Sequence, residues 1–156
     1  MSIERARKYF SEMGIEDRVR EFEVSSATVE KAAEAVGCEP MRIAKSLSFM
    51  IKGVPTIVVV AGEARIDNRK FKDEFLAKAK MIDPNELEEL VGHEMGGICP
   101  FGIKDGVDVF LDISLKLFET VFPACGSDNS AIELSIEEME KYSNYIKWVD
   151  VCKNWE

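Results

Sequence analysis

Two short stretches of the sequence carry most of the residues that could do chemistry. The first is RIAKSLSF, in which Lys45 lies where a predicted one-turn helix passes into a predicted strand. Its neighbours Ile43, Ala44, Leu47 and Phe49 are apolar. A lysine at such a junction can stand in the wall of a pocket with its ammonium directed inward. The alternative is a surface lysine whose apolar stem packs on the protein while the ammonium stays in water.

The second stretch is residues 96–102, GGICPFG, in which three glycines and a proline exclude a regular helix or strand. Glycines allow a backbone to approach a ligand closely, and their N–H groups can bind a carbonyl oxygen or stabilise negative charge that develops on it. The stretch is not GxGxxG and lacks the Lys-Ser/Thr of a phosphate-binding loop. A binding loop built from backbone and a purely structural loop both fit this pattern.

Cys99 and His93 suggest a third kind of chemistry, a thiol nucleophile activated by an imidazole. Their separation in sequence neither requires nor forbids contact, and no third partner is evident, although Asp108 and Asp112 follow closely. A metal site is not expected, because there is one histidine and neither a CxxC nor an HExxH motif. Reduced and mostly buried thiols are expected at Cys38, Cys99, Cys125 and Cys152.

Length and composition predict one globular domain over residues 1–156, with 46% hydrophobic and 31% charged residues. The beginning, MSIERARKYF, has no apolar stretch of signal-peptide type, and the longest apolar run is too short to cross a bilayer, so we expect a cytoplasmic protein. The net charge of −9 disfavours broad nucleic-acid binding. Residues 40–82, however, hold nine basic and four acidic residues, which allows a local surface that faces anions.

The elements that must position these residues are short helices mixed with strands, which predicts an α+β fold. SLSFMI and TIVVV, separated by Gly53-Val54-Pro55, predict a hairpin that begins next to Lys45. A further strand, VDVFL, follows the glycine loop, and two strands flank CGSDNS. Helix signals predict helices at 2–12, 28–36, 67–77, 83–92 and 136–142, and further strands are predicted at 19–24, 80–82 and 147–151.

Four segments in this order resemble the YbaK family, the editing domains related to the insertion domain of bacterial prolyl-tRNA synthetases. They are RIAKSLSF, VPTIVVVAG, VGHEMGGICPFG and VFLDISLKLFETVFPACGSDNSAIELS. GGICPFG fits a family pattern of Gly-Gly-x-x-Pro-Phe-Gly, and the resemblance extends from about residue 2 to 151. It implies one α+β domain with a curved, mostly antiparallel sheet surrounded by short helices.

The resemblance also implies an activity, the hydrolysis in trans of the ester of a mischarged aminoacyl-tRNA, without a metal or organic cofactor. The expected partners are the acceptor end of an aminoacylated tRNA and, as a further candidate, an aminoacyl-tRNA synthetase. A monomer is the default. Small amino acids such as Ala, Ser, Cys or Thr are the candidate substrates by family analogy.

Residue roles are carried over by position. Lys45 would anchor the substrate near the terminal adenosine and the ester, as a fixed cation and not as a base. The backbone at Gly97 would position the aminoacyl carbonyl. Residues expected to bind the substrate or wall a small, size-selective pocket are Gly96, Ile98, Cys99, Pro100, Phe101, Gly102, Gly126 and Ser130.

One departure keeps an alternative open. Some editing branches carry a histidine in the late loop, where this chain has Ser130. A non-catalytic module of the same fold that binds tRNA or a nucleotide is therefore the second hypothesis. An unrelated hydrolase that uses Cys99 is the third.

Overall fold

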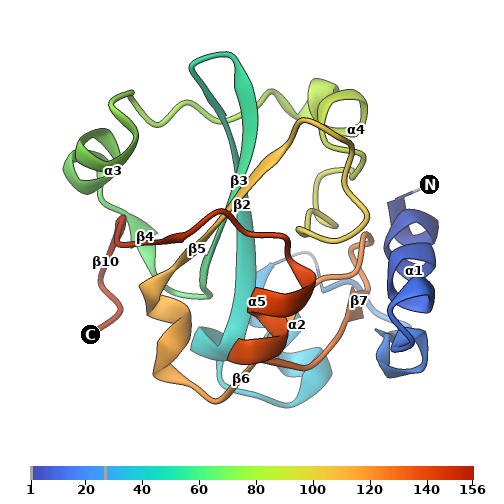
Figure 1. Ribbon diagram of the computed structural model, residues 1–156. Helices are drawn as coiled ribbons and strands as arrows, with labels where there is room; N and C mark the ends of the chain where they lie inside the picture. Colours follow the sequence, from blue (N-terminus) through green and yellow to red (C-terminus); the bar gives the residue numbers. More distant parts are fainter. Residues whose placement is uncertain (1, 27) are drawn as a thin grey trace.

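The computed structural model describes residues 2–26 and 28–156, and within them the central feature is a six-stranded sheet (Figure 1). The order of its strands is β8-β6-β2-β3-β5-β9. Their bounds are β2 Ile43–Ile51, β3 Val54–Ala61, β5 Asp108–Asp112, β6 Thr120–Pro123, β8 Leu134–Ser135 and β9 Trp148–Val149. Two small antiparallel pairs lie beside it, β1 Arg20–Glu21 with β7 Ser130–Ala131, and β4 Arg65–Ile66 with β10 Cys152–Lys153.

The hairpin β2–β3 forms the middle of the sheet, as the sequence predicts. Its register runs from Ala44 opposite Ala61 to Ile51 opposite Val54. The turn places Lys52 and Gly53 at φ of 49° and 81°, the left-handed backbone that a two-residue hairpin turn requires. The strands are longer than predicted, because Ile43 to Lys45 continue β2 instead of ending a helix.

The α+β class is confirmed, but the central sheet is mixed. Among the described strands, β2–β3 and β6–β8 pair antiparallel, whereas β2–β6, β3–β5 and β5–β9 pair parallel. The sheet is thus less antiparallel than expected. The long connection from β3 to β5 explains the difference, because a connection that carries helices can return the chain to the same edge for a parallel strand.

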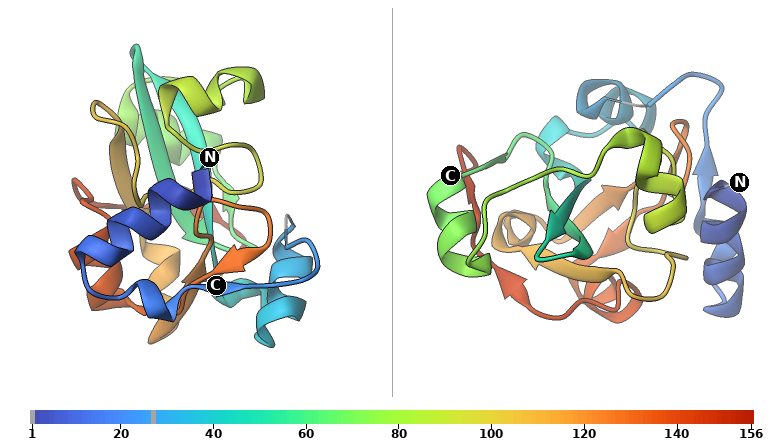
Figure 2. Two further views of the ribbon diagram at one scale, coloured as in Figure 1. Left: turned by 90° about the vertical axis from the view of Figure 1, so that its right-hand side faces the viewer. Right: turned by 90° about the horizontal axis from the view of Figure 1, so that it is seen from above.

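Short helices surround the sheet, and polar side chains cap several of their N-termini. Thr28, Asp67 and Ser135 accept N-cap hydrogen bonds, and Ser135 forms a capping box with Glu138. Figure 2 shows α1 on one side of the molecule and α3 on the opposite side, near the C-terminus. The bounds are α1 Ser2–Glu12, α2 Val29–Val36, α3 Asn68–Phe75, α4 Leu87–Leu90 and α5 Ile136–Tyr142.

Two predicted strands are much shorter in the structure. The alternating stretch 19–24 pairs only at Arg20 and Glu21, and the stretch 80–82 contributes a single bridge between Met81 and Phe49. Both stretches lie at the periphery, where little sheet is available to pair with them. Alternation alone does not supply a partner strand.

The sheet separates two apolar cores, which decides where the side chains of β2 point. One core holds Val59 and Phe101, and the other holds Val60 and Phe71. Because residues directly opposite each other in an antiparallel pair share a face, Ser46 opposite Val59 lies on the first side. Lys45, opposite Val60, lies on the second side.

Candidate functional site

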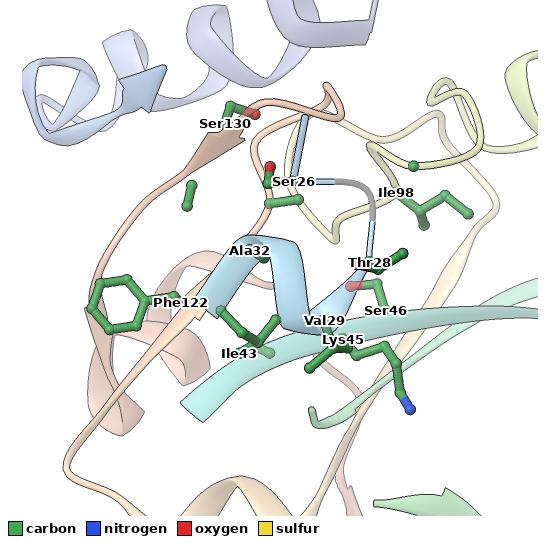
Figure 3. Close-up of a pocket in the computed structure, with 14 residues that line it drawn as sticks. Ser26, Thr28, Val29, Ala32, Ile43, Lys45, Ser46, Ile98, Phe122 and Ser130 are labelled. Atoms are coloured by element: carbon green, nitrogen blue, oxygen red, sulfur yellow. The ribbon is translucent and has the colours of Figure 1, made fainter. Parts of the chain in front are cut away.

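A small cavity of about 160 Å³, here called the Ser46 cavity, lies where the start of β2 meets α2, the glycine loop and the β6–β7 segment (Figure 3). Most of its wall is apolar. Among the described residues, Lys45 is the one charged residue of the lining. The lining residues are Ser26, Thr28, Val29, Ala32, Ile43, Ala44, Lys45, Ser46, Gly96, Ile98, Phe122, Ala124, Ser130 and Ala131.

Ser46 contributes an unusual polar group to this cavity. Its hydroxyl oxygen is buried and has no hydrogen-bond partner within residues 2–26 and 28–156. A buried hydroxyl without a partner costs about 1–3 kcal/mol, so such groups are uncommon in folded proteins. Figure 3 shows the Ser46 side chain on the Ile98 side of β2, among the other lining residues.

Lys45 occupies the wall of the cavity, and of the two arrangements that the sequence allows, the one with the ammonium directed into the cavity is not observed. Nζ donates a hydrogen bond to the carbonyl oxygen of Ala64 at 3.0 Å, and Figure 3 shows it pointing away from Ser46 and Ile98. Burial lowers the pKa of Lys45, and the nearby charge of Arg65 lowers it further, while Glu30 raises it. The side chain therefore lies between the Ser46 cavity and the turn that contains Ala64.

The glycine loop meets the cavity through Gly96 and Ile98, two of the predicted site residues. Gly97 does not line the cavity and packs instead against Gly126 and Ser127 of the late loop. A Cβ at this position would stand 2.5 Å from the carbonyl carbon of Gly126 and 2.6 Å from the nitrogen of Ser127, so only glycine allows the two loops to touch. The N–H of Gly97 donates to the carbonyl of Glu94 at 3.0 Å and is not a free donor, contrary to the expectation.

The second half of the loop turns away from the cavity into the core beneath α1. Phe101 is fully buried, with its ring 4.8 Å from that of Phe10. Gly102 has φ of 66° and lies against the backbone of Arg5, whose Nε donates to the Gly102 carbonyl at 2.8 Å. Gly96, Ile98 and Ser130 are thus the predicted wall residues that the cavity retains. The predicted wall residues absent from the described lining are Cys99, Pro100, Phe101, Gly102 and Gly126.

Cys99 and His93 are in contact, but their geometry argues against a thiol hydrolase. The Sγ of Cys99 lies 3.4 Å from Nε2 of His93, and that Nε2 lies 2.6 Å from the carbonyl oxygen of Phe101. Since a carbonyl only accepts, Nε2 carries the proton and cannot accept one from the thiol. Burial lowers the pKa of His93 and raises the pKa of the fully buried Cys99 to about 12, so the thiol stays neutral.

The late loop closes the cavity on the side of β7. Gly126 has φ of 89° and its carbonyl accepts a hydrogen bond from the hydroxyl of Ser2, which joins the loop to the start of α1. The Ser130 oxygen accepts from the N–H of Cys125 at 3.2 Å and from the Ser127 hydroxyl at 2.8 Å. Ser130 therefore lines the cavity while its hydroxyl stabilises the loop.

One wall of the cavity is missing from the sequence-based prediction. Val29 and Ala32 belong to α2, and Ser26 and Thr28 come from the segment that leads into it. The Ser26 hydroxyl donates to the Asp128 carbonyl of the late loop at 3.0 Å. The sequence predicts a helix over 28–36 but does not indicate what that helix packs against. Ser46 could have been singled out as a polar residue next to Lys45 in a strand otherwise rich in apolar residues.

Two further classes of site find no support in the part of the chain that the structure describes. No cluster of three or more His, Cys, Asp or Glu side chains is arranged to hold a metal ion there. Among those same residues, no helix is both long and apolar enough to cross a membrane.

Comparison with known proteins identifies the family to which the chain belongs. Residues 23–142 match the family described as the aminoacyl-tRNA editing domain. The chain belongs to this family, as the resemblance of its motifs predicts.

Individual relatives agree with this assignment. The chain is 54% identical over 157 residues to the uncharacterized protein YwhH of Bacillus subtilis (strain 168), with both chains covered completely. It is 30% identical over 104 residues to a proline–tRNA ligase of Shouchella clausii, which covers 66% of this chain but only 18% of the ligase. The crystal structure of a candidate trans-editing enzyme for prolyl-tRNA synthetase superposes with a TM-score of 0.88 at 26% identity, covering 98% of each chain.

Proposed function

We propose that the protein is a trans-acting deacylase that hydrolyses the ester of a tRNA mischarged with a small amino acid. The observation that carries the proposal is the Ser46 cavity in an aminoacyl-tRNA editing domain, a small and largely apolar space bounded by Lys45 and by Gly96 and Ile98 of the glycine loop. The structural match over almost the whole chain to a candidate trans-editing enzyme supports action in trans.

The volume of the cavity suits a small substrate. An apolar cavity of about 150 Å³ in a protein core can hold one benzene molecule. At about 160 Å³, the Ser46 cavity has room for one small side chain with its α-carbon. A basic side chain would find no opposite charge there among the described lining residues, which disfavours basic amino acids.

The reaction needs little beyond positioning. Water attacks the carbonyl carbon of the aminoacyl ester, the bond from that carbon to the ribose oxygen breaks, and a proton passes to the released ribose hydroxyl. An aminoacyl ester is already activated, so a strong nucleophile is not required. An oriented water molecule and a fixed cation near the developing negative charge provide most of the increase in the rate of hydrolysis. Lys45 is the cation that we assign to this role.

A panel of aminoacylated tRNAs tests the proposal. Purified protein is incubated with tRNAs that carry Ala, Ser, Cys, Thr or Pro, and loss of each ester is followed. We expect selective hydrolysis of at least one ester and a decrease of about 100-fold or more in Lys45→Ala, the size of effect seen when an oxyanion-stabilising group is removed. Lys72→Ala, an exposed lysine on α3, is the matched control and should hydrolyse as wild type does.

The second candidate function is a module that binds tRNA without hydrolysing the ester. Ser130 favours it, because some editing domains have a histidine at this position. Its hydroxyl is occupied by the loop and is not free to act on a substrate. Affinity for aminoacyl-tRNA without loss of any ester would favour this module. Equal hydrolysis by wild type and Lys45→Ala would show that the assigned site is wrong.

A further inference from the structure

The hydroxyl of Ser46 is a polar group of the Ser46 cavity to which the proposed reaction assigns no role. Its oxygen is buried and makes no hydrogen bond within residues 2–26 and 28–156. The other polar side chains of the described lining each hold a hydrogen bond to another part of the protein. They are Ser26, Thr28, Lys45 and Ser130. Within this lining, Ser46 is therefore the side chain that is left to bind a group inside the cavity.

The position of Ser46 on β2 keeps its hydroxyl at the cavity. Ser46 pairs with Val59 in the middle of the sheet, and it lies on the face opposite to Lys45, because successive side chains of a strand alternate. Figure 3 shows the Ser46 side chain on the side of β2 where Thr28 and Ile98 lie. A strand that is paired along its length cannot shift to bring the hydroxyl to a distant partner. A group that pairs with this hydroxyl must therefore enter the cavity.

The rest of the wall limits the chemistry of that group. The wall includes the apolar side chains of Val29, Ile43, Ile98 and Phe122. The α-ammonium of an amino acid would lose its hydration there without meeting a carboxylate among the described lining residues, and the charge of Lys45 would oppose it. A neutral hydroxyl costs less to bury, and it can both donate to and accept from the hydroxyl of Ser46. The wall thus favours a hydroxyl group as the partner of Ser46.

We propose that Ser46 selects the substrate, through a hydrogen bond to the side-chain hydroxyl of a serine or threonine carried by the tRNA. The inference rests on the proposed function and narrows its substrates from small amino acids to those with a β-hydroxyl group. A side chain of the same size with a methyl group in place of the hydroxyl would leave Ser46 buried without a partner. A site built to bind a hydroxyl rejects such an analogue for this reason.

Binding of two substrate analogues tests the proposal without any turnover. The probes are 3′-aminoacyl adenosines with an amide in place of the ester, one carrying serine and the other 2-aminobutyrate. Their side chains have nearly the same size and differ in one hydroxyl. Calorimetry should show that wild type binds the seryl probe about tenfold more tightly, the effect of about one buried hydrogen bond. In Ser46→Ala the two probes should bind about equally.

Hydrolysis gives the second comparison, with one tRNA charged in turn with Ser, 2-aminobutyrate, Thr or Val. In wild type, kcat/KM should be about tenfold higher for Ser than for 2-aminobutyrate, and for Thr than for Val. Ser46→Ala should remove both preferences by slowing the hydrolysis of the Ser and Thr esters. A purely structural role of Ser46 would instead slow all four esters by the same factor.

Ser48→Ala is the matched control for both comparisons. Ser48 is buried on the same face of β2, two residues after Ser46, and it is absent from the described lining of the cavity. Both preferences should therefore remain in Ser48→Ala. Loss of the preferences in Ser48→Ala to the same degree as in Ser46→Ala would assign them to the strand and not to the Ser46 hydroxyl.

Stability provides a readout that is independent of the substrate. Without a ligand, the Tm of Ser46→Ala should be at least that of wild type, because the substitution removes a buried hydroxyl that has no partner. A clear decrease in Tm would show that the hydroxyl is already paired in the free protein, which contradicts the inference.

The inference and the proposed function fail in different ways. Equal binding of the seryl and 2-aminobutyryl probes to wild type would overturn the inference, because Ser46 would then hold a water molecule or a group that all amino acids share. Hydrolysis of small esters without a preference for the hydroxyl would also overturn it, while the proposed function would stand. The proposed function fails if no ester is hydrolysed, and the probe preference can still be measured in that case.

Discussion

At the residue scale, Cys99 shows how a reactive side chain becomes a packing residue. It lies in a glycine-rich loop six residues after the only histidine, and the two side chains do meet. Full burial nevertheless raises the pKa of the thiol to about 12, and the Nε2 proton of His93 is directed at the Phe101 carbonyl. The contact thus joins two ends of a loop and does not activate a nucleophile.

We therefore predict that Cys99→Ala keeps the rate of ester hydrolysis within a few fold of wild type. The removed sulfur leaves a small void in the core, so the free energy of unfolding should fall by about 1–2 kcal/mol. Deacylation assays and urea denaturation measure the two effects. Complete loss of hydrolysis in a folded Cys99→Ala protein would contradict this prediction and would indicate that the thiol acts as a nucleophile.

At the element scale, the site depends on two loops that touch through glycine backbone. Gly97 lies against Gly126 and Ser127, and Gly126 in turn lies against the start of α1. Gly96 and Ile98 enter the Ser46 cavity only because Gly97 lets the loop approach this closely. The glycines therefore serve the shape of the site, more than the supply of free N–H donors.

Gly97→Ala should lower the free energy of unfolding by about 2 kcal/mol or more, because its Cβ would meet backbone atoms that cannot move aside as a flexible side chain can. The rate of ester hydrolysis should also fall, because the same clash displaces Ile98 from the wall of the Ser46 cavity. In Gly106→Ala the Cβ would meet nothing within 4 Å, and the cost should be only the roughly 1 kcal/mol of a left-handed backbone at φ of 90°. Denaturation curves of the two variants, if they coincide, would show that the two loops are not tightly packed.

At the scale of the whole molecule, charge pairs join parts that are distant in sequence. Arg18, between α1 and β1, forms a salt bridge of 2.6 Å with Glu138 of α5. The hydrogen bond from Arg18 is the main reason that the pKa of Glu138 falls from 4.5 to about 2, with a further contribution from the N-cap Ser135. The pair ties the N-terminal segment to the last helix.

Glu138 has a lower pKa in the folded than in the unfolded chain, so its contribution to stability is present above about pH 4.5 and is lost as pH falls toward about 2. Glu138→Gln should therefore be less stable than wild type at pH 7, and the difference should shrink between pH 4.5 and pH 2. Because the Arg18–Glu138 pair is partly exposed, high salt should also reduce the difference in stability between wild type and Glu138→Gln. Urea denaturation at several pH values gives the comparison, and a difference independent of pH would contradict the assigned pKa.

Local signals in the sequence determined much of the structure. The hairpin beside Lys45, the helices predicted at 28–36, 67–77 and 136–142, and the α+β class all follow from short-range patterns and are confirmed. The family is also confirmed, because the order of RIAKSLSF and GGICPFG along the chain is itself a sequence property. The hairpin and the helices depend on neighbours within a few residues, and the order of the motifs is read directly along the chain, so no knowledge of packing is required to recognise these features.

Only the tertiary structure decided which side chains meet. Strand alternation places Lys45 and Ser46 on opposite faces, but the packing of the two cores determines which face the cavity opens on, and it is that of Ser46. The contact of Gly97 with Gly126 brings together residues far apart in the chain, and so does the wall formed by α2 and the residues before it. Such contacts leave no periodic signal in one sequence, because they are fixed by the close packing of the complete fold.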